Sequence, residues 1–232
     1  VIPAAILLGA QWMQTFQFSF FGITVSIRSY YFISLFMIIC SLIPFFMVFE
    51  KRKPQARELV VIAVLSAIAV AGRAAFFMLP QFKPTAAIVI ITGVSLGAEA
   101  GFLTGALAGF VSNFFFGQGP WTPWQMFSFG IIGFLAGLIF RRKRGKWKHF
   151  TLWLCIYGGL STLIIYGFLM DTASVFMGLG AVQETAFLAA YISGFPMNMI
   201  HATASVVFLA VLGNPIMRKL DRIKKKYGIL EP

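Results

Sequence analysis

The sequence is poor in charge, and this shortage excludes a soluble globular domain. Only 11% of the 232 residues are charged, whereas soluble domains carry about 25%. The chain is therefore predicted to be an integral membrane protein. Its two cysteines, Cys40 and Cys155, both fall in apolar stretches. Two isolated thiols there indicate buried packing, so neither a disulfide scaffold nor a metal site is expected.

Sequence motifs for nucleotide binding and for metal-dependent catalysis are also missing. The chain has no G-x-x-x-x-G-K-[ST] loop, so it cannot bind ATP in the P-loop manner, and it has no H-E-x-x-H motif or metal-ligand cluster. Its seven Asp and Glu residues fall at or near the ends of apolar stretches. A proton-coupled transporter usually keeps an acidic residue deep in its helices. We therefore expect neither an enzyme nor a self-sufficient pump, and no cofactor.

What the chain has in abundance is apolar sequence, 59% of all residues. A spanning helix needs roughly 20 mostly apolar residues. The fold class predicted is all-α, a polytopic transmembrane helix bundle with an N-terminal helix pair in 1–50 and a six-helix core in 58–226. A tight turn at Glu99 separates the fourth helix from the fifth, because one helix over 84–116 would be about 50 Å long. The eight predicted helices cover 3–22, 30–49, 58–79, 84–98, 101–116, 124–140, 150–170 and 185–213.

The net charge of +12 comes from basic residues gathered in three places. Short basic loops stay cytoplasmic, so both termini are predicted inside the cell, and the segments 81–83, 117–125 and 171–184 outside. A solvated basic face, as nucleic-acid binding requires, is not expected. The three clusters are Lys51, Arg52, Lys53 and Arg57; Arg141, Arg142, Lys143, Arg144, Lys146 and Lys148; and Arg218, Lys219, Arg222, Lys224, Lys225 and Lys226.

The outer segment 117–125 is the most distinctive. Its two glycines and two prolines predict a turn-rich loop without a regular helix. Trp121 and Trp124 give it flat apolar faces, and Gln118 and Gln125 give it amide groups. Such side chains suit a ligand-binding loop, although tryptophan is also enriched as an anchor at membrane interfaces.

Within the predicted helices, Arg73 is an ionisable group in the outer third of the membrane, which by default suggests function. Asp171 or Glu184 is the expected neutralising partner, and snorkelling to the interface is the alternative. Asn198 and His201 share a helix face and serve either a ligand or helix packing.

Small residues recur every four positions in two parts of the predicted core. Ala63, Ala67 and Ala71 share one face of the first core helix, which suits either internal packing or docking of a membrane partner. The glycines at 93, 97, 101, 105, 109, 133 and 137 predict tight internal packing.

Four segments together resemble a known family, the substrate-binding S components of energy-coupling factor (ECF) vitamin importers. They are 84–87 (PTAA), 93–101 (GVSLGAEAG), Gly105 and 116–125 (FGQGPWTPWQ). The likeness covers about residues 58–226, and the tryptophan loop is most similar to the cobalamin-type S components.

The resemblance implies a bacterial plasma-membrane subunit that captures a vitamin outside and topples to release it inside. Its partners would be a membrane coupling subunit, contacted by the alanine face, and two cytoplasmic ATPases. Cobalamin is the expected ligand, and riboflavin and pantothenate stay open. The predicted substrate-binding residues are Arg73, Lys83, Asn113, Gln118, Trp121, Trp124, Gln125, Asp171, Glu184, Tyr191, Asn198 and His201.

Two hypotheses from other classes remain. A membrane scaffold or lipid-handling protein would use its tryptophans only as anchors. A secondary transporter acting alone would work without ATP or partners.

Overall fold

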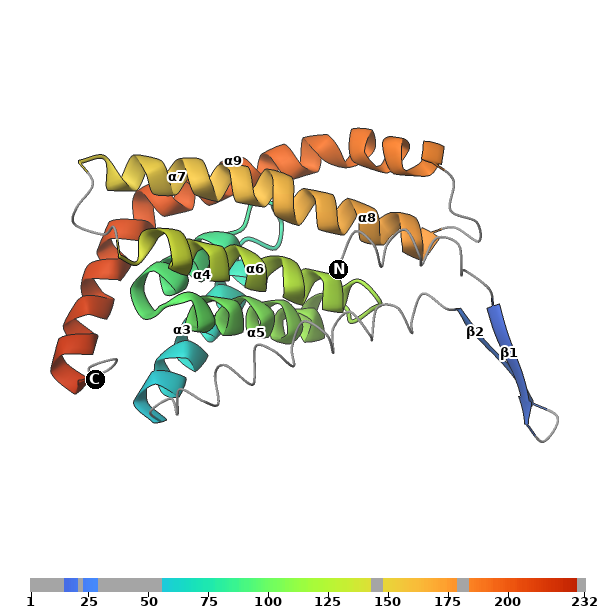
Figure 1. Cartoon of the computed structure of the whole chain (residues 1–232), viewed down its shortest axis with the longest axis horizontal. Coiled ribbons are helices and arrows are strands. Elements are labelled where there is room, and N and C mark those ends of the chain that lie inside the picture. Colours follow the sequence, from blue (N-terminus) through green and yellow to red (C-terminus); the bar gives the residue numbers. More distant parts are fainter. Residues whose placement is uncertain (1–14, 21–22, 29–55, 143–147, 179–183, 229–232) are drawn as a thin grey trace.

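A computed structural model describes residues 15–20, 23–28, 56–142, 148–178 and 184–228 of the chain. Apart from one strand pair, the regular elements in these ranges are helices (Figure 1). The elements are β1 (Thr15–Phe20), β2 (Ile23–Arg28), α3 (Ala56–Ala75), α4 (Thr85–Leu96), α5 (Ala98–Phe116), α6 (Thr122–Phe140), α7 (Phe150–Ser161), the π-helical η1 (Thr162–Tyr166), α8 (Gly167–Gly178) and α9 (Glu184–Tyr227).

The strand pair corrects the predicted first helix. β1 and β2 are antiparallel, with Thr15 opposite Arg28 and Phe20 opposite Ile23, and they lie away from the helices in Figure 1. The helix predicted over 3–22 is therefore wrong from Thr15 onward. Alternating residues such as Thr24, Ser26 and Arg28 between Ile23, Val25 and Ile27 have the period of a strand. The helix predicted over 30–49 lies outside the described residues.

The core helices confirm the predicted helical bundle. Four of them are long and apolar enough to cross a membrane: Ala56–Ala75, Thr122–Phe140, Phe150–Met177 and Thr185–Tyr227. The turn predicted at Glu99 falls at Gly97, where φ is +119°. Glu99 instead lies in the first turn of α5, where a carboxylate is favoured by the helix dipole.

The helix α4 forms the centre of the bundle. It has only 12 residues, fewer than a span needs, yet all of them are buried. It contacts α3, α5, α6 and α9, and these neighbours enclose it (Figure 1). A helix that is apolar on every side belongs in such a core. Four of the predicted spans thus have helices long and apolar enough to cross a membrane, and the crossing of all six core helices stays a prediction.

Glycines bring α4, α5 and α6 into close contact, as predicted. A Cβ added to Gly93 or Gly101 would collide with the carbonyl oxygen of Gly133, and one added to Gly105 with the backbone of Phe129. Backbones can approach this closely only where side chains are absent.

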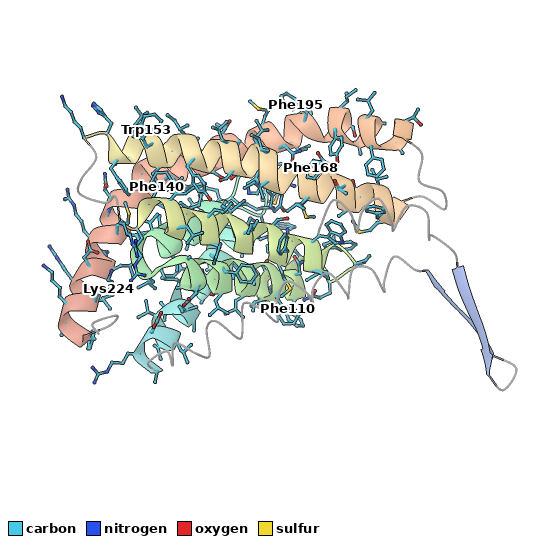
Figure 2. The ribbon with its side chains drawn as sticks, in the orientation of Figure 1. Phe110, Phe140, Trp153, Phe168, Phe195 and Lys224 are labelled. Carbon is cyan, nitrogen blue, oxygen red and sulfur yellow. The ribbon has the colours of Figure 1, made fainter. Side chains whose placement is uncertain are left out.

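One end of the bundle carries the basic residues. The helix α9 is 44 residues long, about 66 Å, with Pro196 and Pro215 inside it. Its C-terminal part bends away in Figure 1, beyond the predicted end at residue 213. There Lys224, labelled in Figure 2, donates to the Ser95 carbonyl at 2.7 Å, and Arg57 of α3 donates to the Tyr227 carbonyl at 2.9 Å.

Candidate functional site

The side chain of Arg73, in the last turn of α3, is the hub of a polar network that joins three helices. Its Nη1 donates to the hydroxyl of Ser112, to Oδ1 of Asn113 at 3.0 Å and to Oε1 of Gln125 at 3.3 Å. Ser112 and Asn113 lie in α5, and Gln125 in α6. The predicted partners of Arg73 were Asp171 and Glu184. For Asp171 this prediction is wrong, because the guanidinium donates to the neutral oxygens of Ser112, Asn113 and Gln125 instead.

The same network holds the loop between α5 and α6. Asn113 donates from Nδ2 to the Thr122 hydroxyl at 3.0 Å, and this hydroxyl donates to Oε1 of Gln118 at 2.9 Å. The Gly119 N–H also donates to Thr122, and Gln118 donates to the Phe110 carbonyl. The loop is therefore shaped by the side chains that surround Arg73.

This loop is shorter than predicted. The helix α6 begins at Thr122, so Pro123, Trp124 and Gln125 are helical, which corrects the prediction that prolines prevent a helix there. Proline is compatible with the first turn because the N–H that it lacks has no partner inside the helix.

A third part of the network reaches α9. Gln125 donates from Nε2 to the Tyr166 hydroxyl at 3.0 Å. The Tyr166 ring stands edge-on to His201, with 4.6 Å between ring centroids, and tilts against Phe129 at 4.8 Å. His201 is 3% exposed, and its Nδ1 has no hydrogen-bond partner among the described residues. The structure thus brings Arg73, Gln125 and His201 together through a tyrosine that the sequence did not single out.

Two cations share one aromatic ring at this site. The Arg73 guanidinium lies 4.8 Å from the centroid of the Phe116 ring, and the Lys83 ammonium 5.6 Å from it. Lys83 lies in the segment between α3 and α4. Burial, and in second place the charge of Arg73, lowers the pKa of Lys83 below its usual value.

The two tryptophans have different environments. Trp124 is 5% exposed and stacks on Phe176 at 6.1 Å, in a cluster with Leu169 and Ala173 of α8. Its faces are filled by the protein, so the predicted role in stacking on a ligand is not supported for Trp124. Trp121 is 38% exposed and folds over Gly119, where a Cβ would meet its indole ring. Of these two tryptophans, only Trp121 has an exposed aromatic surface.

Asp171, Asn198 and Tyr191 form a separate polar group between α8 and α9. Asn198 donates from Nδ2 to the Asp171 carboxylate at 2.8 Å, and the hydroxyls of Thr172 and Tyr191 are 2.8 Å apart. Asp171 was predicted in an outer loop but lies inside α8. This also corrects the expectation that no acidic residue lies deep within a helix. Glu184 is the first residue of α9, and its side chain lies outside the described part.

Sequence reasoning missed Ser112, Phe116, Thr122 and Tyr166. Ser112 and Thr122 are next to predicted residues in the sequence, but small hydroxyl side chains did not stand out there as candidates. Tyr166 had no signal, because it ends the π-helical η1. Such a segment adds a residue to one turn and rotates the turns after it, which the helical period of the sequence cannot reveal. π-bulges occur frequently at functional sites.

The alanine face of α3 is open. Ala63, Ala67 and Ala71 are all exposed, beside exposed Val64 and Ile68. Of the two predicted uses, internal packing is therefore excluded for these alanines within the described chain. The described residues include no group of three or more His, Cys, Asp or Glu side chains that could hold a metal ion.

Long apolar helices around a polar site beneath one loop define a multi-pass helical membrane protein. The chain belongs to the ECF-type riboflavin transporter S component family, whose sequence model matches residues 53–221. The predicted likeness to ECF S components is thereby confirmed, and the chain is a transporter subunit and not an enzyme. The particular vitamin is a separate question.

Three relatives with similar sequences are UPF0397 proteins, a name that states no ligand. A UPF0397 protein of Vibrio atlanticus is 27% identical over 178 residues, covering 74% of this chain and 94% of the relative. UPF0397 proteins of Aliivibrio salmonicida and Aliivibrio fischeri are 29% identical over 181 and 184 residues, with the same coverage. No solved structure matches the chain significantly.

Proposed function

We propose that this chain captures a vitamin at the outer side of the membrane, in the polar network around Arg73. The observation that carries the proposal is a cation in a helix long and apolar enough to cross a membrane. Its hydrogen bonds to the described residues all go to neutral side chains, next to the loop 117–121. A charge in the membrane is costly and marks a functional site by default. The amides of Asn113 and Gln125 give this site the polar groups that fix a ligand's orientation.

Cobalamin is the first ligand to test, since the segment 116–125 resembles the cobalamin-type S components. The family description supports riboflavin instead. Pantothenate is the third candidate, because its carboxylate suits Arg73 and Lys83. Trp121, the exposed tryptophan of this loop, offers one flat face to any of them.

Transport requires partners, and we propose that they are a membrane coupling subunit and two cytoplasmic ATPases. The absence of a P-loop from this sequence and its family membership support this. The basic residues at one end of the bundle favour a cytoplasmic location for that end, and for both termini, in a bacterial cell. The loop 117–121 then faces outward, and toppling in the membrane carries the site inward.

The test is a calorimetric titration of the purified full chain in detergent with cobalamin, riboflavin and pantothenate. We expect one of them to bind tightly. Asn113→Leu removes the amide that links Arg73 to Thr122 and should weaken binding about 10- to 100-fold, because it leaves buried polar groups unpaired. Asn214→Leu is the matched control, since this exposed asparagine bonds to Thr151 at the basic end.

The scaffold hypothesis makes the opposite prediction. If a well-folded sample binds none of the three vitamins, the proposal fails and a scaffold or lipid-handling role is favoured. Equal losses in Asn113→Leu and Asn214→Leu would contradict the placement of the site. Uptake into vesicles that contain this chain alone, without ATP, would indicate a secondary transporter.

A further inference from the structure

The guanidinium of Arg73 donates hydrogen bonds to the described residues from only one of its three nitrogens. All three of its hydrogen bonds to the described residues leave from Nη1. Its Nε and Nη2 form the other edge of the fork, and no described residue accepts from them. Two parallel N–H groups on one edge match the two oxygens of a carboxylate or phosphate.

Lys83 adds a second positive charge near Arg73. Its ammonium shares the Phe116 ring with Arg73, and it forms no hydrogen bond or ion pair with any of the described residues. Two cations brought together on one ring repel each other, and burial removes the water that would screen them. An anion placed between them would relieve this cost.

The described part of the chain supplies no such anion. Glu58 lies 15 residues before Arg73 on α3, about 22 Å away, and Glu99 is about 21 Å from Asn113 along α5. Asp221 lies in the basic C-terminal part of α9. Asp171 is held by Asn198. Neither cation is thus paired with a carboxylate among the described residues.

The neighbouring amides leave the positive charge of this site uncompensated, because they are neutral. Asn113 and Gln125 both turn their oxygens toward Arg73, and their NH₂ groups donate to Thr122 and Tyr166. Each amide oxygen therefore already serves the cation, and each NH₂ group gives one of its two N–H bonds to a neighbouring side chain. The donors that Arg73 and Lys83 offer to a ligand at this point are positively charged.

We propose that Arg73 and Lys83 form an anion subsite, in which the Nε and Nη2 edge of Arg73 binds a carboxylate or phosphate group of the ligand. This inference rests on the proposed vitamin-binding function and narrows it to vitamins with an anionic group. Pantothenate has a carboxylate and cobalamin a phosphodiester. Riboflavin, for which the family is described, has neither, so the subsite would separate this chain from a neutral flavin ligand.

The test compares ligands that differ only in the anionic group. The full chain in detergent is titrated with pantothenate and panthenol, which has an alcohol in place of the carboxylate, and with riboflavin 5′-phosphate and riboflavin. Cobalamin is titrated alongside. A carboxylate source and a phosphate source are thereby distinguished. We expect the anionic member of one pair, or cobalamin, to bind, with about a 10- to 100-fold preference over a neutral partner.

Variants assign the preference to the subsite. Arg73→Gln should abolish the preference for the anionic ligand. Arg73→Lys should retain the charge but lose the bidentate contact, and Lys83→Gln should reduce the preference partly. Lys83 lies outside the helices, so its variant keeps the test valid if Arg73 variants unfold. Arg222→Gln, an exposed arginine at the basic end, is the control. A thermal transition in detergent checks that each variant is folded.

The outcomes separate the inference from the function on which it rests. Tight binding of riboflavin or panthenol, equal to that of the anionic partner, would overturn the anion subsite and keep the vitamin-binding function. Cobalamin binding that is unchanged in Lys83→Gln and in folded Arg73 variants would do the same. Binding of no ligand at all would overturn both.

Discussion

At the scale of single residues, the site depends on side chains that hold other side chains. Tyr166 is the clearest case, because its hydroxyl accepts from the same Gln125 whose oxygen faces Arg73. Its ring also fills the space between Phe129 and His201. The hydroxyl and the ring can therefore be tested separately.

We predict that Tyr166→Phe weakens vitamin binding and lowers the free energy of unfolding by about 1–3 kcal/mol. The ring contacts stay, but the buried amide of Gln125 loses its acceptor, and an unpaired buried donor costs about that much. Calorimetry gives the affinity, and thermal unfolding in detergent gives the stability.

Tyr157→Phe is the control for this change. The Tyr157 hydroxyl donates to the Ile132 carbonyl at 2.6 Å, away from Arg73. This variant should unfold somewhat more easily and bind with unchanged affinity. If both tyrosine variants lose affinity equally, Tyr166 has no particular role at the site.

At the scale of elements, α8 and α9 are joined by a reciprocal fit. Asn198 of α9 packs against Gly167 of α8, and Asp171 of α8 packs against Gly194 of α9, each where a Cβ would collide. Between the two glycines the side chains form their hydrogen bond. We interpret Asp171 and Asn198 as a clamp between helices, in contrast to the ligand contacts that the sequence predicted.

Exchange of the two residues tests this interpretation. Asn198→Ala alone should destabilise the protein by about 1.5–3 kcal/mol, since it removes a hydrogen bond to a charged group. The double variant Asp171→Asn with Asn198→Asp keeps both shapes and restores the pair, so stability and vitamin affinity should both recover. Recovered stability without recovered affinity would show that the Asp171 carboxylate contacts the ligand.

The helix bounds could be predicted from the sequence because apolar runs and their ends are local features. The helix predicted over 124–140 starts two residues late, and the one predicted over 101–116 starts three residues late. The strand at 23–28 had a signal in its alternating apolar and polar residues, but the strand at 15–20 was assigned to the apolar run before it, because Phe suits both structures. The π-helical turn before Gly167 was also hidden, since it changes no composition.

At the scale of the whole molecule, the sequence named several residues of the network around Arg73 but not how the helices bring them together. Whether these residues bind a ligand stays a prediction. Arg73, Asn113, Gln118 and Gln125 were all found from residue type. Their mutual arrangement was not, because it depends on how α3, α5 and α6 cross. Asp171 as the partner of Arg73 was wrong for the same reason, while the side chain of Glu184, the other predicted partner, lies outside the described part.

The helix α3 connects the site with an open face of the molecule. Arg73 lies two residues after Ala71, the last of three exposed alanines on that helix. In lipid, small residues at this spacing permit close approach of another helix. We therefore predict that Ala67→Leu separates binding from transport. The purified chain should keep its vitamin affinity, because Ala67 points away from the bundle, while uptake by cells with their own coupling subunit and ATPases falls.

The size of this loss follows from overpacking a tight contact, which costs about 1–3 kcal/mol and corresponds to roughly a 5- to 100-fold weaker association with the partner. Ala210→Leu is the matched control, since Ala210 is also exposed but lies on α9. Labelled-vitamin uptake and co-purification of the partner subunits measure the effect. Equal uptake by the two variants would mean that the partner docks elsewhere and that the alanine face of α3 contacts only lipid.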